Sequence, residues 1–516
     1  MSCQAPADGP EATIGDASWP ASGAAVGSVQ GSSEGSAPCA AEESTQARGR
    51  TDPVVQASCG GAQDWVIDGA AIAVVDAAGT EHARGHLVVL GGRIAAVGAG
   101  PAPAQAVPEG ARRVDGSGCL LTPGLVNTHH HLSQWLTRGM AADSELFGWL
   151  TELYPWWAGI TAELEHAGAL GALSALALSG CTTTMDHQYV FPAGSGDLLA
   201  AEIEAATRLG VRFHPSRGSM DLGRSAGGLP PDEVVEDTDA ALEATEEAIS
   251  RFHDGSPGAM VRVAVAPCSP FSVTRELMVG AAELARRRGV RLHTHLAETI
   301  DEDAYCKERF GCTPAEYAES LGWLGDDVWV AHGVHLTPAA LGKLGATRTG
   351  VAHCPSSNGR LGAGIAPVPE LLAAGAPVGL GVDGSASNES GELWPEVRGA
   401  LLVARARAGA GALGTRDVLR MATMTGARCL GREDELGSLE IGKLADVALW
   451  RLDTAAHAGI ADPVAAFTLG ARPPLSLLLV GGRAVVEDGE LVRLSSYAVA
   501  REVTAAVRRL GERSAR

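Results

Sequence analysis

The sequence lacks the basic clusters and long apolar runs that mark nucleic-acid-binding and membrane-spanning proteins. Its 516 residues carry a formal net charge of −21, and no Lys/Arg cluster stands ready to neutralise phosphates. This excludes a nucleic acid polymer as a partner, although not a single uncharged base. No apolar run approaches the length of a membrane span, and the N-terminus lacks the basic start and apolar core of a secretory signal. We therefore expect a cytoplasmic protein that does not bind membranes.

Paired cysteines are also missing. The ten cysteines are scattered along the chain, and none forms a Cys-x-x-Cys pair. A chain of this length does not need a disulfide framework, and disulfides are rare in the cytosol, so we expect reduced thiols. The 46% hydrophobic content is typical of a globular enzyme with a large core.

Residues 1–62 lack a hydrophobic period. They are rich in Gly, Ala, Ser, Pro and Glu, a composition that predicts a disordered low-complexity extension. A start codon assigned too far upstream would leave the same pattern, and both interpretations stay open.

Short β-rich runs, broken by Gly and Asp turns, lie near both ends of the remaining chain. They occupy 65–76, 86–98 and 111–121, and return at 437–453 and 475–492. We predict one small β-sandwich built from both ends, with 63–120 as its N-terminal part and 433–495 as its C-terminal part. Residues 496–516 are expected to form a C-terminal helix.

Residues 121–432 alternate strand-like runs with helical segments, the pattern of repeated βα units. Eight candidate strands end at His131, His187, Arg217, Pro267, His295, His332, Cys354 and Asp383. They predict an α/β fold of the (β/α)8 TIM-barrel type, in which active sites lie at the carboxyl ends of the strands. A doubly wound sheet is disfavoured, because no Gly-x-Gly-x-x-Gly follows the first strand.

A metal site is predicted where these strands end. His129 and His131 lie two apart on an extended segment, so both project to one side while His130 points away. Alone, such a pair is weak support, but His295 and Asp383 end strands that converge on the same barrel mouth. Three histidines and an aspartate with an open position form a hydrolytic site that accepts Zn²⁺ or Fe²⁺.

The segments around these residues resemble the amidohydrolase superfamily over about residues 63 to 495. They read PGLVNTHHHLSQWLTRG, RLHTHLAET, WVAHGVHL, AHCPSSNGRLGAGIAPV and GLGVDGSASN. Within the superfamily, the chain resembles guanine and 8-oxoguanine deaminases and triazine aminohydrolases. LFGWLTELYPWWAGI, RGSMDLG and APCSPFSVT are similar to the 8-oxoguanine type. The resemblance implies one catalytic Zn²⁺ per subunit, since no lysine ends the fourth strand to bridge two ions.

The resemblance also implies a mechanism. A metal-activated water attacks the ring carbon that bears an exocyclic amine, and Asp383 accepts the proton of the water. Glu298 shuttles protons to a ring nitrogen, and His332 orients the water and contacts the substrate. The implied reaction is the hydrolytic deamination of an aminopurine, 8-oxoguanine to urate plus ammonia.

Three further residues are candidates for substrate binding. Gln134 occupies the place of a purine-binding glutamine in guanine deaminases, and its amide both donates and accepts. Arg217 ends the third strand, where a guanidinium could bind a carbonyl oxygen or an anionic ring. Cys268 stands where guanine deaminases carry arginine, which favours 8-oxoguanine over guanine. The alternatives are a helix-start glutamine, a surface salt bridge and a small buried residue.

The sequence also allows other interpretations. An aminohydrolase of hydroxylated s-triazines would use the same metal on the same class of small heteroaromatic amine. A non-catalytic barrel scaffold is disfavoured because every ligand and acid/base residue is present. Many relatives form homo-oligomers, which makes a homo-oligomer possible, but the sequence specifies no interface. Four other histidines near strand ends are expected to support the site rather than bind the ion: His130, His187, His335 and His353.

Overall fold

The computed structural model describes residues 63–514, which belong to one compact unit, and the expectation for residues 1–62 lies outside this range. Eight strands close a barrel in which every neighbouring pair is parallel. In order they are β6 (Leu125–Asn127), β8 (Cys181–Gln188), β9 (Arg212–Ser219), β10 (Ala264–Pro267), β11 (Leu292–Leu296), β12 (Val328–His332), β13 (Gly350–His353) and β14 (Val378–Leu380). The predicted eight-stranded barrel is confirmed.

The remaining strands form a second sheet from both ends of the chain. Nine strands take part: β1 (Trp65–Ala73), β2 (Glu81–Leu90), β3 (Arg93–Ala99), β4 (Arg112–Asp115), β5 (Cys119–Pro123), β16 (Val447–Arg451), β17 (Leu475–Val480), β18 (Arg483–Glu487) and β19 (Glu490–Leu491). The N-terminal and C-terminal parts join where β5 pairs with β16 in antiparallel register. All nine strands are therefore hydrogen-bonded into one sheet.

The segment 121–131, predicted as a single strand, is divided among three. Its start belongs to β5 in the second sheet, its middle is barrel strand β6, and its end forms the short strand β7 (His130–His131). β7 pairs in parallel with β15 (Asp383–Gly384), outside the barrel proper. This pairing places the chain that follows β6 beside the chain that follows β14, at the mouth of the barrel.

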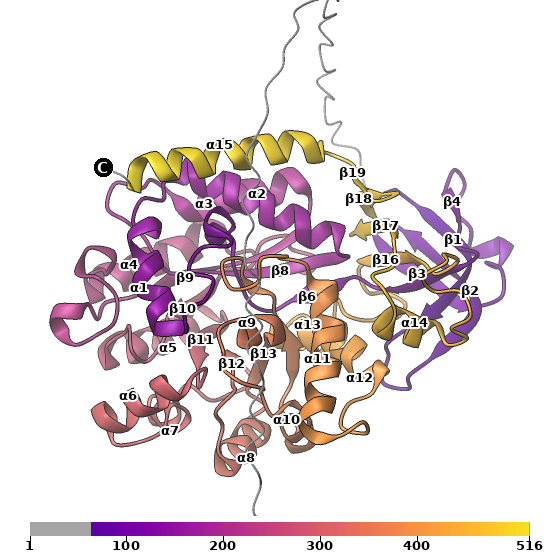
Figure 1. Cartoon of the computed structure of the whole chain (residues 1–516). Helices are drawn as coiled ribbons and strands as arrows, with labels where there is room; N and C mark the ends of the chain where they lie inside the picture. Colours follow the sequence, from indigo (N-terminus) through magenta and orange to yellow (C-terminus); the bar gives the residue numbers. More distant parts are fainter. Residues whose placement is uncertain (1–62, 515–516) are drawn as a thin grey trace, which may run out of the picture. The chain divides into compact units, whose positions relative to one another are not determined.

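Helices follow most of the barrel strands and surround them (Figure 1). Their bounds are α1 Leu146–Trp157, α2 Ala162–Leu178, α3 Leu198–Leu209, α4 Thr238–Phe252, α5 Arg275–Arg288, α6 Ile300–Phe310, α7 Pro314–Ser320, α8 Pro338–Thr347, α9 Pro355–Arg360, α10 Val368–Ala374, α11 Leu393–Ala408, α12 Thr415–Arg420, α13 Gly426–Cys429, α14 Pro463–Leu469 and α15 Ser496–Ser514. Helix α15 packs across α2 (Figure 1). Within the described part of the chain, no helix has both the length and the apolarity needed to cross a membrane.

Local sequence explains where these helices begin and end. Helix α5 begins after Thr274, whose hydroxyl accepts the backbone N–H of Leu277 and so satisfies a free donor of the first turn. It ends at Gly289, which takes the left-handed conformation at φ 65°.

One buried ion pair ties the barrel to the second sheet. Arg212, at the start of β9, donates to both carboxylate oxygens of Asp446 at 2.7 and 3.0 Å. The backbone N–H of Gly481 donates to the same carboxylate at 2.8 Å. Because both charged groups are buried and hydrogen-bonded, this pair fixes how the two parts of the described chain dock.

Candidate metal centre

The four predicted ligands meet at the mouth of the barrel. His129 follows β6, His131 lies in β7, His295 lies in β11 and Asp383 lies in β15. All four are buried, with at most 8% of their surface exposed. The Nε2 atoms of His131 and His295 lie 3.1 Å apart, and Oδ1 of Asp383 lies 3.2 Å from His129 Nε2 and 3.3 Å from His131 Nε2.

The opposite ring nitrogens show which tautomers these histidines adopt. Nδ1 of His131 lies 2.8 Å from the carbonyl oxygen of His187, and Nδ1 of His295 lies 2.8 Å from that of Cys268. A carbonyl oxygen only accepts, so each Nδ1 must carry the hydrogen. In the neutral imidazoles, each Nε2 atom therefore carries a lone pair and no hydrogen.

The tautomer of His129 is the same, and it is set by a neighbouring histidine, His293. Nδ1 of His293 lies 2.9 Å from the carbonyl oxygen of Trp329, so Nε2 of His293 is an acceptor. Nδ1 of His129 lies 2.9 Å from that acceptor and must donate to it. Nε2 of His129 is thus a lone pair, and it has no hydrogen-bond partner among the described residues.

Three imidazole lone pairs and a carboxylate oxygen facing one another repel unless a cation lies between them. Neutral imidazoles with their far N–H groups held by acceptors, together with a carboxylate, are the donor set of protein zinc sites. His129, His131, His295 and Asp383 therefore fit a divalent metal ion. His130 points away from this set, as predicted, and its Nδ1 accepts the backbone N–H of His131.

For two of these histidines, His129 and His295, the direction of the pKa shift favours the neutral imidazole that a metal ligand requires. Burial lowers the pKa of His129 well below its usual range, and burial with the neighbouring imidazoles lowers the pKa of His295 to about 3. Burial also lowers the pKa of His131, but Asp383 outweighs it and raises the net value. Without an ion, a proton on His131 would relieve part of the repulsion, so proton and metal compete for this site.

Asp383 is held in a strained position by its neighbours. Its φ of 64° and that of His332, 72°, lie in the left-handed region that residues other than glycine rarely adopt. The hydroxyl of Ser357 donates to Oδ2 of Asp383 at 2.5 Å, and the backbone N–H of Gly384 donates to Oδ1 at 2.7 Å. These bonds aim the carboxylate at the histidines.

Glu298 and His332 lie beside the cluster. Oε2 of Glu298 is 3.7 Å from Nε2 of His332, and Nδ1 of His332 lies 2.9 Å from Oδ1 of Asn358. The buried carboxylate of Glu302 anchors the loop by accepting the backbone N–H groups of Ala297 and Glu298. Burial, with the charge of Asp383, raises the pKa of Glu298 well above its usual range, which favours the protonated acid.

A pocket opens onto the cluster. Its walls combine the polar groups already described with aromatic and apolar side chains, namely His131, Gln134, Leu146, Trp149, Leu150, Tyr154, Tyr189, Cys268, Ser269, Phe271, His295, Glu298, His332, Leu361 and Asp383. No Lys or Arg of residues 63–514 is among them. The pocket therefore suits a flat ring without a phosphate.

Two of the three predicted substrate contacts line this pocket. Oε1 of Gln134 is buried without a hydrogen-bond partner in the described chain, so the amide is free to pair with a ligand. Burial raises the pKa of the Cys268 thiol to about 12, which keeps it protonated and excludes a thiolate nucleophile.

Arg217 does not line the pocket, which corrects the expectation that it faces the barrel mouth. Its guanidinium donates to both carboxylate oxygens of Glu236, at 2.8 and 2.6 Å, and lies 3.6 Å from the ring centre of Phe191. The salt-bridge alternative describes this side chain, although the pair is largely buried rather than at the surface.

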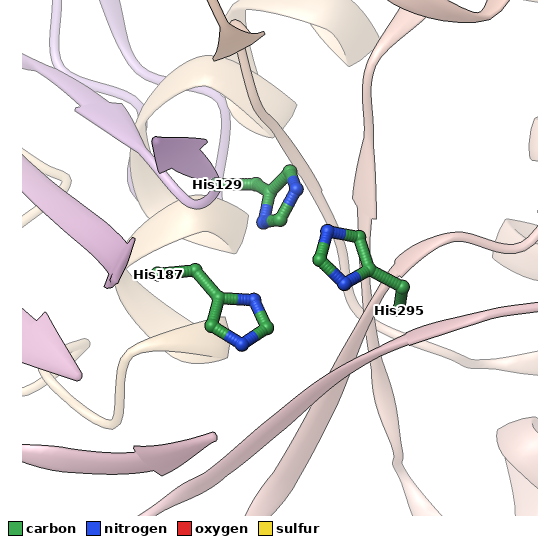
Figure 2. A group of neighbouring side chains, drawn as sticks. All are labelled: His129, His187 and His295. Carbon is green, nitrogen blue, oxygen red and sulfur yellow. The ribbon is translucent and has the colours of Figure 1, made fainter. Parts of the chain in front are cut away.

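One histidine that contacts the cluster, His293, was not predicted as part of the site. His293 had a signal, since it lies two residues before His295 on the same strand and so shares its face. His187 was expected only to support the site, yet it offers a ring nitrogen within 4.8 Å of nitrogens of His129 and His295. Figure 2 shows that His187 turns this nitrogen toward the space between the other two rings.

Comparison with known proteins agrees with this geometry. The amidohydrolase family model matches residues 120–485. The chain is 47% identical to the 8-oxoguanine deaminase of Pseudomonas aeruginosa over 420 residues, which cover 81% of this chain and 93% of that protein. It is 37% identical to the hydroxydechloroatrazine ethylaminohydrolase of a Pseudomonas species over 452 residues, 84% of this chain and 93% of that protein.

A solved structure shares the whole architecture. The atrazine chlorohydrolase of Arthrobacter aurescens, in complex with zinc, matches with a TM-score of 0.81 at 33% identity. The match covers 86% of this chain and 99% of that chain. With a barrel of this topology and a donor set of this kind, the chain belongs to the amidohydrolase family and is a metal-dependent hydrolytic deaminase.

Proposed function

We propose that this protein hydrolyses 8-oxoguanine to urate and ammonia at a site that holds one zinc ion. The observation that carries the proposal is the convergence of three imidazole lone pairs and Asp383 in a pocket that also contains Glu298 and His332. The 47% identity to the 8-oxoguanine deaminase of Pseudomonas aeruginosa supports the choice of substrate.

His129, His131, His295 and Asp383 would hold the ion. Neutral imidazoles and a carboxylate suit Zn²⁺, and the same donors accept Fe²⁺. When bound, such an ion lowers the pKa of a water molecule so that hydroxide is available near neutral pH.

His332 and Glu298 would manage the protons. Nδ1 of His332 donates to Asn358, which leaves Nε2 as an acceptor that orients the attacking water. Glu298, whose raised pKa favours the protonated acid, would deliver its proton to a ring nitrogen as the oxygen–carbon bond forms. Asp383 accepts the proton of the water. Asp383 would then pass this proton to the amine, so that the carbon–nitrogen bond breaks and ammonia leaves, while the hydroxyl proton of the intermediate returns to Glu298 as the carbonyl forms.

The pocket would hold the purine between apolar and aromatic walls. The absence of cationic side chains among the described lining residues favours a free base over a nucleotide. The unpartnered amide of Gln134 supports pairing with a lactam edge, where a carbonyl accepts and an N–H donates. Protonated Cys268 adds a small neutral wall.

A hydroxylated s-triazine is the second candidate substrate. The 37% identity to hydroxydechloroatrazine ethylaminohydrolase favours it, because the same metal and acid would act on an amine attached to a similar ring. The two candidates differ in the shape and polar edge of the ring, and these are recognised by the pocket rather than by the metal.

Steady-state kinetics on the purified zinc-loaded protein tests the proposal. We expect the highest kcat/KM, measured by ammonia release, for 8-oxoguanine within a panel that includes guanine, isoxanthopterin and hydroxyatrazine. Turnover of hydroxyatrazine with negligible turnover of the purines would replace the first candidate by the second. No ammonia from any amino-heterocycle would contradict both and favour a non-catalytic barrel.

A further inference from the structure

A second cavity, the basal cavity, lies at the amino ends of barrel strands, away from the metal cluster at their carboxyl ends. Two histidines line it: His214 near the start of β9 and His253 directly after α4. Two arginines also line it, Arg262 before β10 and Arg291 before β11. No Asp or Glu of residues 63–514 is among its lining residues. The proposed reaction does not use this end of the barrel, where side chains ordinarily serve stability.

Three of these side chains carry polar groups without a protein partner or with a donor to spare. Only 4% of His214 is exposed, yet its Nε2 has no hydrogen-bond partner in the described chain, and neither has Nε of Arg262. Nδ1 of His253 accepts the backbone N–H of Val263 at 3.1 Å, so in the neutral ring Nε2 carries the hydrogen and can donate. The basal cavity therefore presents more donors than its walls can satisfy.

Arg291 adds a guanidinium whose outer edge faces the same space. Its Nε donates to the carbonyl oxygen of Cys429 at 2.9 Å, and its Nη2 donates to that of Asp326. These bonds hold the side chain and leave the N–H groups of Nη1 for another acceptor. A β-carbon on Gly431, which also lines the basal cavity, would lie 2.9 Å from this Nη1, so the group borders the cavity.

Positive charge is in excess around the basal cavity. Arg262 and the buried Arg432 share one carboxylate, Glu435, at 3.3 and 2.6 Å, whereas the hydrogen bonds of Arg291 go to carbonyl oxygens. Burial, with the charge of Arg262, lowers the pKa of Arg432 to about 10. Burial, with the surrounding arginines, lowers the pKa of His214 well below its usual range. Buried charge without a partner is costly, so these groups would be stabilised by an anion.

We propose that the basal cavity binds one small oxyanion, of the class of phosphate, sulfate or a carboxylate, through Arg262, Arg291 and His253. Guanidinium groups match the geometry of such oxyanions, and hydrogen bonds to an ionised acceptor are strong. A cation would meet further positive charge, and an apolar ligand would leave the donors unsatisfied. The bound anion would connect the starts of β10 and β11 and so stabilise the folded barrel. This site goes beyond the proposed function, because it involves neither the metal ion nor the purine.

Isothermal titration calorimetry on the zinc-loaded protein tests the proposal, with the ionic strength held constant by NaCl. Phosphate, sulfate and acetate are titrated separately, and we expect at least one of them to bind saturably at one site per chain. Arg291→Gln removes a guanidinium. His253→Asn keeps an acceptor for the backbone of Val263 but removes the Nε2–H donor. The matched control is Arg287→Gln, which removes the same charge from an exposed position in the last turn of α5.

The affinity for the best-bound anion should fall at least about tenfold in Arg291→Gln and in His253→Asn, because each loses a hydrogen bond to a charged group. In Arg287→Gln it should stay within about twofold, since salt screens exposed charges. The same anion should raise Tm less in the two cavity variants than in the unaltered protein. If Arg291→Gln does not fold, His253→Asn decides alone.

The absence of saturable binding of all three anions would overturn the proposal. Unchanged affinity in the cavity variants would overturn it as well, because the anion would then bind elsewhere, for instance at the zinc ion. Equal weakening in Arg287→Gln would show a general attraction by charge and no built site. Ammonia release is not a readout, so failure of the proposed function would leave this test unaffected.

Discussion

Replacing Gly384 by alanine tests whether Gln134 positions the substrate. A β-carbon at Gly384 would lie 1.7 Å from Oε1 of Gln134 and 2.3 Å from its Cδ. Ordinary contact begins at 3.4 Å, so the amide oxygen must move by about 1.7 Å. Gln134 is buried within the 3-10 helix Leu132–Thr137, which leaves its side chain little room except toward the pocket.

The expected loss follows from that displacement. In a positioned site, a shift of about 1 Å costs about 100-fold in rate, so kcat/KM for 8-oxoguanine should fall by about 100-fold in Gly384→Ala. This corresponds to about 2.7 kcal/mol of transition-state stabilisation. Gln134→Ala removes the same contact and should lower kcat/KM by about tenfold to 100-fold.

A double-mutant cycle then isolates the contact between these residues. Once Gln134 is truncated, the added β-carbon has room, so Gly384→Ala should cost little more in the Gln134→Ala background. Bound zinc per chain must stay unchanged in all variants, because Gly384 follows the ligand Asp383. Additive losses, or full activity in Gly384→Ala, would refute the role given to Gln134.

Three further results are expected. Glu298→Gln should lower kcat by about 10² to 10⁴-fold at unchanged zinc content, because the amide cannot deliver a proton; near-normal turnover would contradict its role. Zinc affinity should fall as the pH is lowered through the raised pKa of His131, because a proton then occupies the metal site, whereas a flat titration would exclude this competition. Burial, with the charges of Asp186 and Glu165, raises the pKa of Glu202, so the folded state holds its proton more tightly than the unfolded state does. The free energy of unfolding should therefore fall as the pH rises from the ordinary pKa of a glutamate toward the raised pKa of Glu202. Glu202→Gln should then raise Tm more at pH 8 than at pH 5, and an equal rise at both pH values would contradict this.

The barrel and its four ligands could be predicted because strand ends carry the information. His129, His131, His295 and Asp383 each follow an apolar β run, and parallel strands in a barrel deliver their carboxyl ends to one mouth. The β-rich blocks at both ends predicted one small β-sandwich, and in the structure both blocks belong to a single sheet, joined where β5 pairs with β16.

The direction of a side chain at a strand end could not be predicted. Arg217 and His187 both lie near the ends of their strands, yet Arg217 pairs with Glu236 while His187 faces the metal cluster. The difference depends on register and on partners supplied by distant loops. The division of 121–131 among three strands has the same origin, since its end pairs with Asp383 far along the chain.

Metal-dependent ammonia release decides whether the barrel mouth is a hydrolytic site that works with one bound ion. Protein stripped with a chelator should release no ammonia from 8-oxoguanine, and one equivalent of Zn²⁺ per chain should restore the rate. Equal rates before and after stripping, or restoration only beyond one equivalent, would contradict a hydrolytic site built on one ion held by His129, His131, His295 and Asp383.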